Sequence, residues 1–323
     1  MALENVKSVL AALKGKKFNR VFYVSCGGSQ ALMMPSKFFV DSVSKTLFAQ
    51  HYNSNEFIYT SPAQLGKDSV VILCSQEGKT PETVKAAAFA NEKGATVITI
   101  AMVDDSPLEK AGGKLFVKYG YYMTADAIDT SYGVMYLLSA GLIDNQEGTD
   151  HLDKMIDSLT KIQPVINKAK VDYLDQIMKM TEVCKDAKVI YSLAAGSNYS
   201  QSYVMCNCYL MEMQWINAIP IHAGEFFHGP FEIIEKDSPV ILLMGKDSCR
   251  FLEERALKFC KKYTDNLFVF DTADCDLTGI DKDYEGYMTT LILNNLCRLF
   301  CHKLAVVRDH SLDIRRYMHI VEY

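Results

Sequence analysis

The chain has 323 residues, of which 49% are hydrophobic and 23% are charged, and its net charge is −5. The hydrophobic share can build a sizeable core and excludes an intrinsically disordered chain, and the length suits two ordinary domains or one large one. The negative balance, without a marked Lys/Arg run, argues against nucleic acid as a partner.

The first half of the chain alternates apolar strand patterns with helical patterns. We expect strands over 20–25, 69–74, 95–101 and 115–119, and helices over 29–47, 81–93, from 106–107 onward, and over 125–142. This alternation predicts a mostly parallel sheet with helices on both faces.

The polar segment 144–150 is a candidate linker. It is followed by a long helical stretch, 151–185, which we expect to be interrupted near Pro164. We therefore predict two domains, residues 1–148 and 149–323.

The same rhythm returns in the second half of the chain. We expect extended segments over 188–193, 218–221, 239–244 and 267–270, and helices over 199–215, 252–263 and 284–307. Segments 22–29 and 190–197 resemble each other, because each is a strand that ends in a Gly-Ser turn. The predicted fold class is therefore α/β, with two doubly wound parallel sheets in tandem. A classical dinucleotide-binding fold is less favoured, since no Gly-x-Gly-x-x-Gly occurs.

The turn Cys74–Glu82 joins a predicted strand to a predicted helix. Free backbone N–H groups and the helix dipole meet at such a turn, and the hydroxyls of Ser75 and Thr80 add donors for an anion. The alternative is a plain helix cap, since Thr80 followed by Pro81 is a good helix start.

Two further turns concentrate small polar residues, Gly27-Gly28-Ser29 and Gly196-Ser197. Ligands of open α/β sheets bind at the carboxyl ends of strands, so Ser29, Ser75 and Thr80 are expected to converge on one phosphate. The alternative is that the glycines only permit tight turns.

Two carboxylates and a histidine are candidates for proton transfer. Pro230 suits a helix start and leaves His228 exposed just before it, with Glu225 nearby, and a structural histidine is the alternative. Glu212 stands among large apolar residues, where burial would favour its neutral form and suit a proton shuttle. It would have no such role if it faced solvent.

The N-terminal segment and the cysteines indicate the cellular compartment of the protein. No signal peptide and no apolar run of membrane-spanning length is evident, and the ten scattered cysteines suit free thiols in a reducing cytoplasm. Cys206-x-Cys208 and Cys297-x-x-x-Cys301-His302 lack a second ligand pair at zinc spacing, so we expect no metal and no cofactor. The Arg-, Tyr- and His-rich tail 309–323 can meet an anionic substrate, strap a neighbouring subunit, or be plain surface.

Two motifs together resemble the sugar isomerase (SIS) superfamily. Ser75-Gln76-x-Gly78-x-Thr80, with Ser29 upstream, is similar to its phosphosugar signature. Glu212 and the segment Gly224–Pro230 resemble the isomerase half of glucosamine-6-phosphate synthase, with Glu212 and His228 sixteen residues apart as in that family. Across nearly the whole chain, including the ends 315–317 and 321–323, the nearest likeness is to the bacterial fructosamine-6-phosphate deglycases.

The resemblance implies hydrolysis of fructosamine 6-phosphates, such as fructoselysine 6-phosphate, to glucose 6-phosphate and a free amine. It implies that Glu212 moves the proton between C1 and C2, and that His228 acts at the ring oxygen, donated across the interface of a homodimer or higher homo-oligomer. Substrate contacts would come from Gly28, Ser29, Ser75, Gln76, Thr80, Glu225, Arg316 and Tyr323.

The sequence departs from the family pattern in three features, and three other functions are alternatives. Glu77 stands where many relatives carry Ser or Thr, so it receives no phosphate contact here, and the chain lacks both the glutaminase domain and the Lys-containing tail of the synthase. A phosphosugar aldose–ketose isomerase, an aminosugar-phosphate deaminase and a non-catalytic sugar-phosphate sensor are the alternatives. The amine released is not identified, and the tail with Arg315 and Arg316 is a candidate for selecting it.

Overall fold

The computed structural model describes residues 2–318 and 320–322 and divides into two compact units, Met1–Gln163 and Pro164–Tyr323. The division falls inside one helix rather than at the polar segment 144–150. The domain limits drawn from the sequence stay a prediction.

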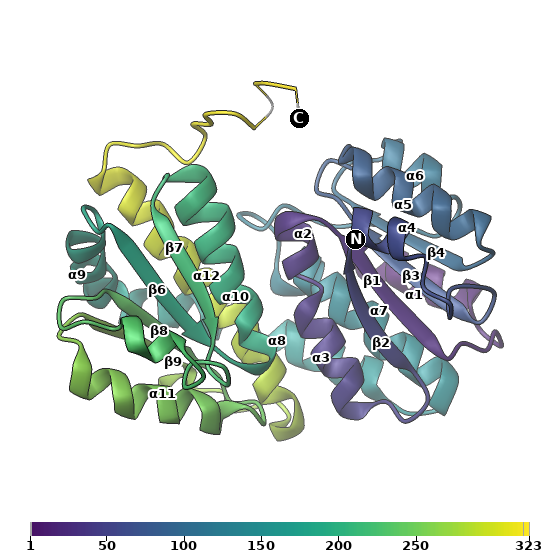
Figure 1. The fold of residues 1–323 in the computed structure, drawn as a ribbon. Helices are drawn as coiled ribbons and strands as arrows, with labels where there is room; N and C mark the ends of the chain where they lie inside the picture. Colours follow the sequence, from purple (N-terminus) through teal and green to yellow (C-terminus); the bar gives the residue numbers. More distant parts are fainter. Residues whose placement is uncertain (1, 319, 323) are drawn as a thin grey trace. The chain divides into compact units, whose positions relative to one another are not determined.

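Unit 1 holds a five-stranded parallel sheet in the order β2-β1-β3-β4-β5 (Figure 1). Its strands are β1 (Arg20–Ser25), β2 (Phe48–Asn53), β3 (Ser69–Cys74), β4 (Thr96–Ala101) and β5 (Phe116–Lys118). Its helices are α1 (Ala2–Ala12), α2 (Gly27–Ala31), α3 (Met34–Val43), α4 (Ser54–Thr60), α5 (Pro81–Glu92), α6 (Pro107–Gly112), η1 (Ala127–Asp129) and α7 (Ser131–Glu147).

Both faces of this sheet are covered, as the alternation along β1 shows. Phe22 and Val24 lie in one apolar cluster with Ala86 and other side chains of α5. Tyr23 points to the other face, where its hydroxyl lies 2.6 Å from Ser139 Oγ on α7. Burial on both faces explains why the central strands read as continuous apolar runs, and it confirms the expected parallel sheet.

Unit 2 repeats the arrangement with a four-stranded parallel sheet in the order β7-β6-β8-β9. Its strands are β6 (Val189–Ala194), β7 (Asn217–His222), β8 (Val240–Met244) and β9 (Leu267–Asp271). Its helices are α9 (Leu174–Cys184), η2 (Gly196–Asn198), α10 (Tyr199–Tyr203), η3 (Val204–Met213), η4 (Pro230–Ile233), α11 (Arg250–Tyr263), η5 (Thr272–Asp274) and α12 (Lys282–Val307). Helix α8 (His151–Asp172) spans the division between the units.

Most predicted elements are confirmed, and the differences have physical causes. The break expected near Pro164 is wrong, because α8 runs through this proline and ends near Tyr173. Strand β2 was not predicted, since its sequence is polar and its residues are only partly buried at the edge of the sheet. The helix expected over 199–215 is present, but from Val204 it winds as a π-helix.

Helix α12 is long and apolar enough to pass a membrane-span test by length and composition, the single such helix found in the described part of the chain. Within the tested window 61% is buried inside the structure, as in the core helix of a folded domain. In Figure 1 it packs along the sheet of unit 2.

Candidate functional site

The predicted phosphate loop of unit 1 is tightly fixed. Gly78 N–H donates to the Ser75 carbonyl at 3.0 Å, and Met102 N–H donates to the Gln76 carbonyl at 2.9 Å. Gly78 has φ +65°, and a Cβ there would lie 2.3 Å from Ser106 Oγ. Only glycine fits this position, so the loop has one backbone conformation.

The two hydroxyls of the loop face each other rather than capping the helix. Ser75 Oγ lies 2.9 Å from Thr80 Oγ1, and Ser75 is 4% exposed. Thr80 occupies the N-cap position of α5, but its side chain accepts no capping hydrogen bond, and Pro81 brings no N–H to the first turn. The first N–H groups of α5 therefore lack the side-chain cap that the alternative interpretation requires, which favours an anion as their partner.

Ser29 reaches the same edge of the sheet. It lies in α2, directly after β1, and its hydroxyl is within hydrogen-bond reach of the Cys74 thiol at the end of β3. Burial raises the pKa of this thiol to about 12, so it stays neutral. Because the order of the sheet reverses at β1, Ser29, Ser75 and Thr80 follow the carboxyl ends of β1 and β3, the place where open α/β sheets bind ligands.

The remaining loop residues point outward. Gly28 and Gln76 are exposed, and Gly28 lies in the first turn of α2. Glu77, the unexplained acidic residue, pairs with Lys79 at 3.2 Å on the exposed side of the loop. The lysine offsets the charge that a phosphate would otherwise meet there.

In unit 2, the turn after β6 corresponds to the Gly27-Gly28-Ser29 turn of unit 1, and it already holds an anion. Ser197 donates its N–H at 2.9 Å and its hydroxyl at 2.6 Å to the carboxylate of Asp247, which follows β8. Cys249 N–H donates to the same carboxylate at 2.8 Å. Gly196–Ser197 thus keeps the geometry of an anion cradle, but a side chain of the chain itself fills it. Nothing in the sequence pattern around Asp247 marked this role beyond its position after a strand.

Glu212 lies near the end of the π-helix η3 and is ion-paired. Its Oε1 lies 3.0 Å from Arg315 Nη2 of the C-terminal tail, and the two side chains are 23% and 20% exposed. Glu212 therefore does not face open solvent, the outcome that would have removed it from consideration. π-Helical turns concentrate at functional sites.

The tail packs over the end of η3. Arg316 stacks its guanidinium 4.2 Å from the ring centroid of Trp215, and His310 contacts the same ring edge-on. Trp215 has φ +56°, a strained conformation for a bulky residue. Such strain is common at functional sites. Tyr323, predicted to bind substrate, lies outside the described residues.

The turn after β7 presents Glu225 and His228 outward. Both are exposed, whereas Phe226 between them is buried in an aromatic cluster with Phe227 and Phe259. This apolar anchor fixes the turn, and Pro230 begins η4 as expected. Among the described residues no hydrogen bond or ion pair joins His228 to Glu212.

The chain resembles known proteins over nearly its full length. Fructosamine deglycase FrlB of Bacillus subtilis is 45% identical over 318 residues, which are 98% of this chain and 97% of that protein. The chain belongs to the SIS-domain fructosamine deglycase family. The family model described as "SIS domain" matches residues 16–142.

Other relatives support the same family and fold. Fructoselysine 6-phosphate deglycase of Escherichia coli is 26% identical over 98% of this chain and 91% of that protein. A crystal structure of a candidate phosphosugar isomerase from Bacillus subtilis superposes with a TM-score of 0.97 at 45% identity, covering 99% of this chain and 97% of that one. The C-terminal domain of glucosamine-fructose-6-phosphate aminotransferase from Francisella tularensis, at 15% identity and a TM-score of 0.73, shares the fold.

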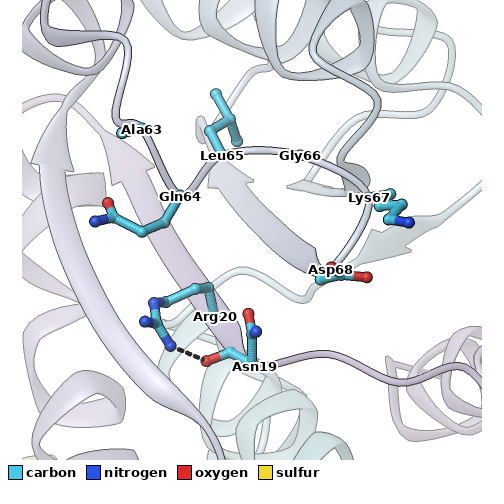
Figure 2. A pocket seen from close by; sticks show the side chains of 8 residues that line it. All are labelled: Asn19, Arg20, Ala63, Gln64, Leu65, Gly66, Lys67 and Asp68. Atoms are coloured by element: carbon cyan, nitrogen blue, oxygen red, sulfur yellow. Dashed lines mark hydrogen bonds between the residues drawn. The ribbon is translucent and has the colours of Figure 1, made fainter.

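A pocket of about 340 Å³ in unit 1 of this SIS protein lies at the opposite edge of the sheet (Figure 2). It is lined by Asn19, Arg20 and residues 63–68, at the amino ends of β1 and β3. Arg20 is turned back to donate to the Asn19 carbonyl at 2.9 Å. Since ligands of this fold bind at the carboxyl ends, this pocket is not the candidate site.

The described residues contain no group of three or more His, Cys, Asp or Glu side chains arranged to hold a metal ion. The ten cysteines are free thiols.

Proposed function

We propose that the protein hydrolyses fructosamine 6-phosphates, such as fructoselysine 6-phosphate, to glucose 6-phosphate and a free amine or amino acid. The observation that carries this proposal is the 45% identity to a fructosamine deglycase over nearly the full length of both chains. The match to fructoselysine 6-phosphate deglycase, again over 98% of the chain, supports the phosphorylated substrate.

The phosphate is bound by the loop of unit 1. Ser29, Ser75, Gln76 and Thr80 supply donors, and Gly28 lets the backbone of α2 approach. The uncapped N–H groups of α5 support this assignment, because they complement a dianion at the helix start.

The chemistry reverses an Amadori rearrangement. The ring opens with proton transfer at the ring oxygen by His228. Glu212 then takes a proton from C1 to form an enaminol and returns a proton to C2, which leaves an imine at C1. Water adds to this imine and the amine departs, so the products are the aldehyde sugar phosphate and the amine. Each well-placed acid or base contributes roughly 10²–10⁴-fold.

The remaining assignments concern the rest of the substrate and the assembly. Glu225 orients the sugar, and Arg316 and Tyr323 meet the amino-acid part. The enzyme is a cytoplasmic homo-oligomer whose sites take His228 from a neighbouring subunit. The exposure of His228, which forms no hydrogen bond or ion pair with Glu212 among the described residues, supports this sharing.

The test is direct. The purified protein is incubated with fructoselysine 6-phosphate and with a panel of related Amadori 6-phosphates, and glucose 6-phosphate is measured with an enzyme-coupled assay. Release of glucose 6-phosphate with stoichiometric amine supports the proposal. Turnover of glucosamine 6-phosphate or of aldose phosphates alone would instead identify a deaminase or isomerase, and binding by calorimetry without turnover would identify a sensor.

A further inference from the structure

The ion pair between Arg315 and Glu212 joins the tail to the proposed base. Arg315 Nη2 lies 3.0 Å from Glu212 Oε1, and both side chains are largely withdrawn from solvent. A partly buried ion pair is screened by salt less than a surface pair. Removing one of its two charges costs more free energy, because the other charge is left without a partner.

Arg315 is held ready for this contact by its own segment. Its Nη1 donates to the carbonyls of Leu312 at 2.7 Å and Ile314 at 3.0 Å. The start of the tail is fixed in turn, because Gln214 Nε2 donates to the His310 carbonyl at 2.7 Å. The guanidinium is therefore preorganised, and little side-chain entropy is lost when it meets the carboxylate.

Two described neighbours contribute to the electrostatics around Glu212. Cys208, earlier on η3, is partly buried, and desolvation raises the pKa of its thiol to about 12, so it adds no charge near neutral pH. From α12, Arg298 donates to Tyr209 Oη at 3.0 Å. Among the described side chains, Arg315 is a cation that directly contacts Glu212.

We propose that Arg315 is a positioning residue that keeps the Glu212 carboxylate ionised and fixed, so that docking of the C-terminal tail makes the base competent. The inference rests on the proposed function of Glu212. A carboxylate must be ionised to accept the proton from C1, and an opposite charge at this distance favours the ionised form. A chain whose tail is undocked then carries a base that protonates more readily and points less precisely.

The experiment compares the pH dependence of kcat/KM in the wild type, Arg315→Gln and Arg315→Lys. We expect the acid limb of Arg315→Gln to move to higher pH by about one unit or more, because the charge partner is lost. We expect Arg315→Lys to restore most of the acid limb, since it keeps the charge, but to leave kcat reduced because the planar fork is lost. KM for the phosphosugar should change little.

Arg308→Gln is the matched control. Arg308, the C-cap residue of α12, donates to the carbonyls of Lys185 and Gln214 and does not pair with Glu212. It should lower thermal stability while leaving the acid limb in place. An unmoved acid limb in Arg315→Gln, or an equal shift in Arg308→Gln, overturns the inference.

A second readout does not depend on turnover. The Glu212 side-chain carboxyl is followed by ¹³C NMR in glutamate-labelled protein and assigned with Glu212→Gln. Its titration midpoint should rise in Arg315→Gln and recover in Arg315→Lys, and an unchanged midpoint overturns the inference even if no deglycase activity is found. Absence of turnover in the wild type with a shifted midpoint would remove the proposed function and leave the pairing role intact.

Discussion

The carboxylate of Asp247 accepts two hydrogen bonds from Ser197, one from its N–H and one from its hydroxyl. In unit 2 this contact lies at the turn that follows strand β6. The corresponding turn of unit 1 follows β1 and contains Gly28 and Ser29. The two halves share a strand order, yet one cradle is filled by a side chain. We infer that only unit 1 offers an anion site at this turn.

Removing the Asp247 carboxylate should destabilise the protein. Asp247→Ala leaves the N–H groups of Ser197 and Cys249 and a buried hydroxyl without their acceptor, and we expect a loss of about 2–3 kcal/mol in the free energy of unfolding. Urea unfolding measures it. Sulfate in the buffer should restore part of the loss in this variant by occupying the emptied cradle. An unchanged stability, or equal sulfate effects on wild type and variant, would contradict the cradle interpretation.

The hydroxyls of the phosphate loop should affect substrate binding. Ser75→Ala and Thr80→Val each remove a donor to a dianion, so KM should rise by roughly 10-fold or more at nearly constant kcat. The matched control is Glu77→Gln in the same loop, where the carboxylate faces Lys79 on the exposed side. Its KM should stay within about twofold of the wild type. A kcat loss without a KM change in Ser75→Ala would argue against a phosphate contact.

Gly78, the one glycine of the loop Cys74–Glu82, should tolerate a side chain poorly. Gly78→Ala forces an L residue to φ +65° and places its Cβ 2.3 Å from Ser106 Oγ. We expect a cost above about 2 kcal/mol together with a raised KM. Gly148→Ala is the control, with φ +71° but nothing within 4 Å of the added Cβ. It should cost only about 1 kcal/mol, and equal losses in both variants would exclude the steric argument.

Sequence patterns predicted what local chemistry determines. Buried parallel strands such as β3 are apolar throughout, and the turn Gly78–Pro81 carries its own helix-start signals, so both could be read directly. The edge strand β2 could not, because its half-buried positions tolerate polar residues.

Contacts between residues far apart in the sequence were the part of the site that could not be predicted. Arg315 and Glu212 are about a hundred positions apart, and no periodicity in either segment links them. The sequence left three roles open for the tail: a substrate contact, a strap on a neighbouring subunit, or plain surface. Its packing on Trp215 depends on tertiary structure. The filled cradle at Asp247 was missed for the same reason, since it joins two turns that only the sheet brings together.

Glu253 should give stability a distinct pH dependence. It is 0% exposed, and burial raises its pKa to about 8, although the N–H groups of Ala195 and Gly245 partly oppose the shift. The folded state therefore holds a proton that the unfolded state has lost, so this group's contribution to stability falls as pH rises from 4.5 to about 8. Urea unfolding across this range measures the slope.

Glu253→Gln is the test of that slope. The amide does not titrate, so the variant should show a flatter decline than the wild type over the same pH range. Its absolute stability should be lower, because the Nε2 amide group takes the place of an oxygen that accepts from a backbone N–H. Identical slopes in both proteins would show that Glu253 does not titrate in this window.

Hybrid oligomers should recover activity if the site takes His228 from a neighbouring subunit. Glu212→Gln and His228→Asn are each expected to be inactive alone. Co-expressed with different tags and purified through both, the hybrid dimer has one site with both wild-type residues and one with neither. An unsorted equal mixture should then regain about one quarter of wild-type activity, from half of the dimers with half of their sites. Tandem-purified hybrids that stay inactive, while wild-type subunits carrying the same tags are active, would place Glu212 and His228 of one working site in the same chain.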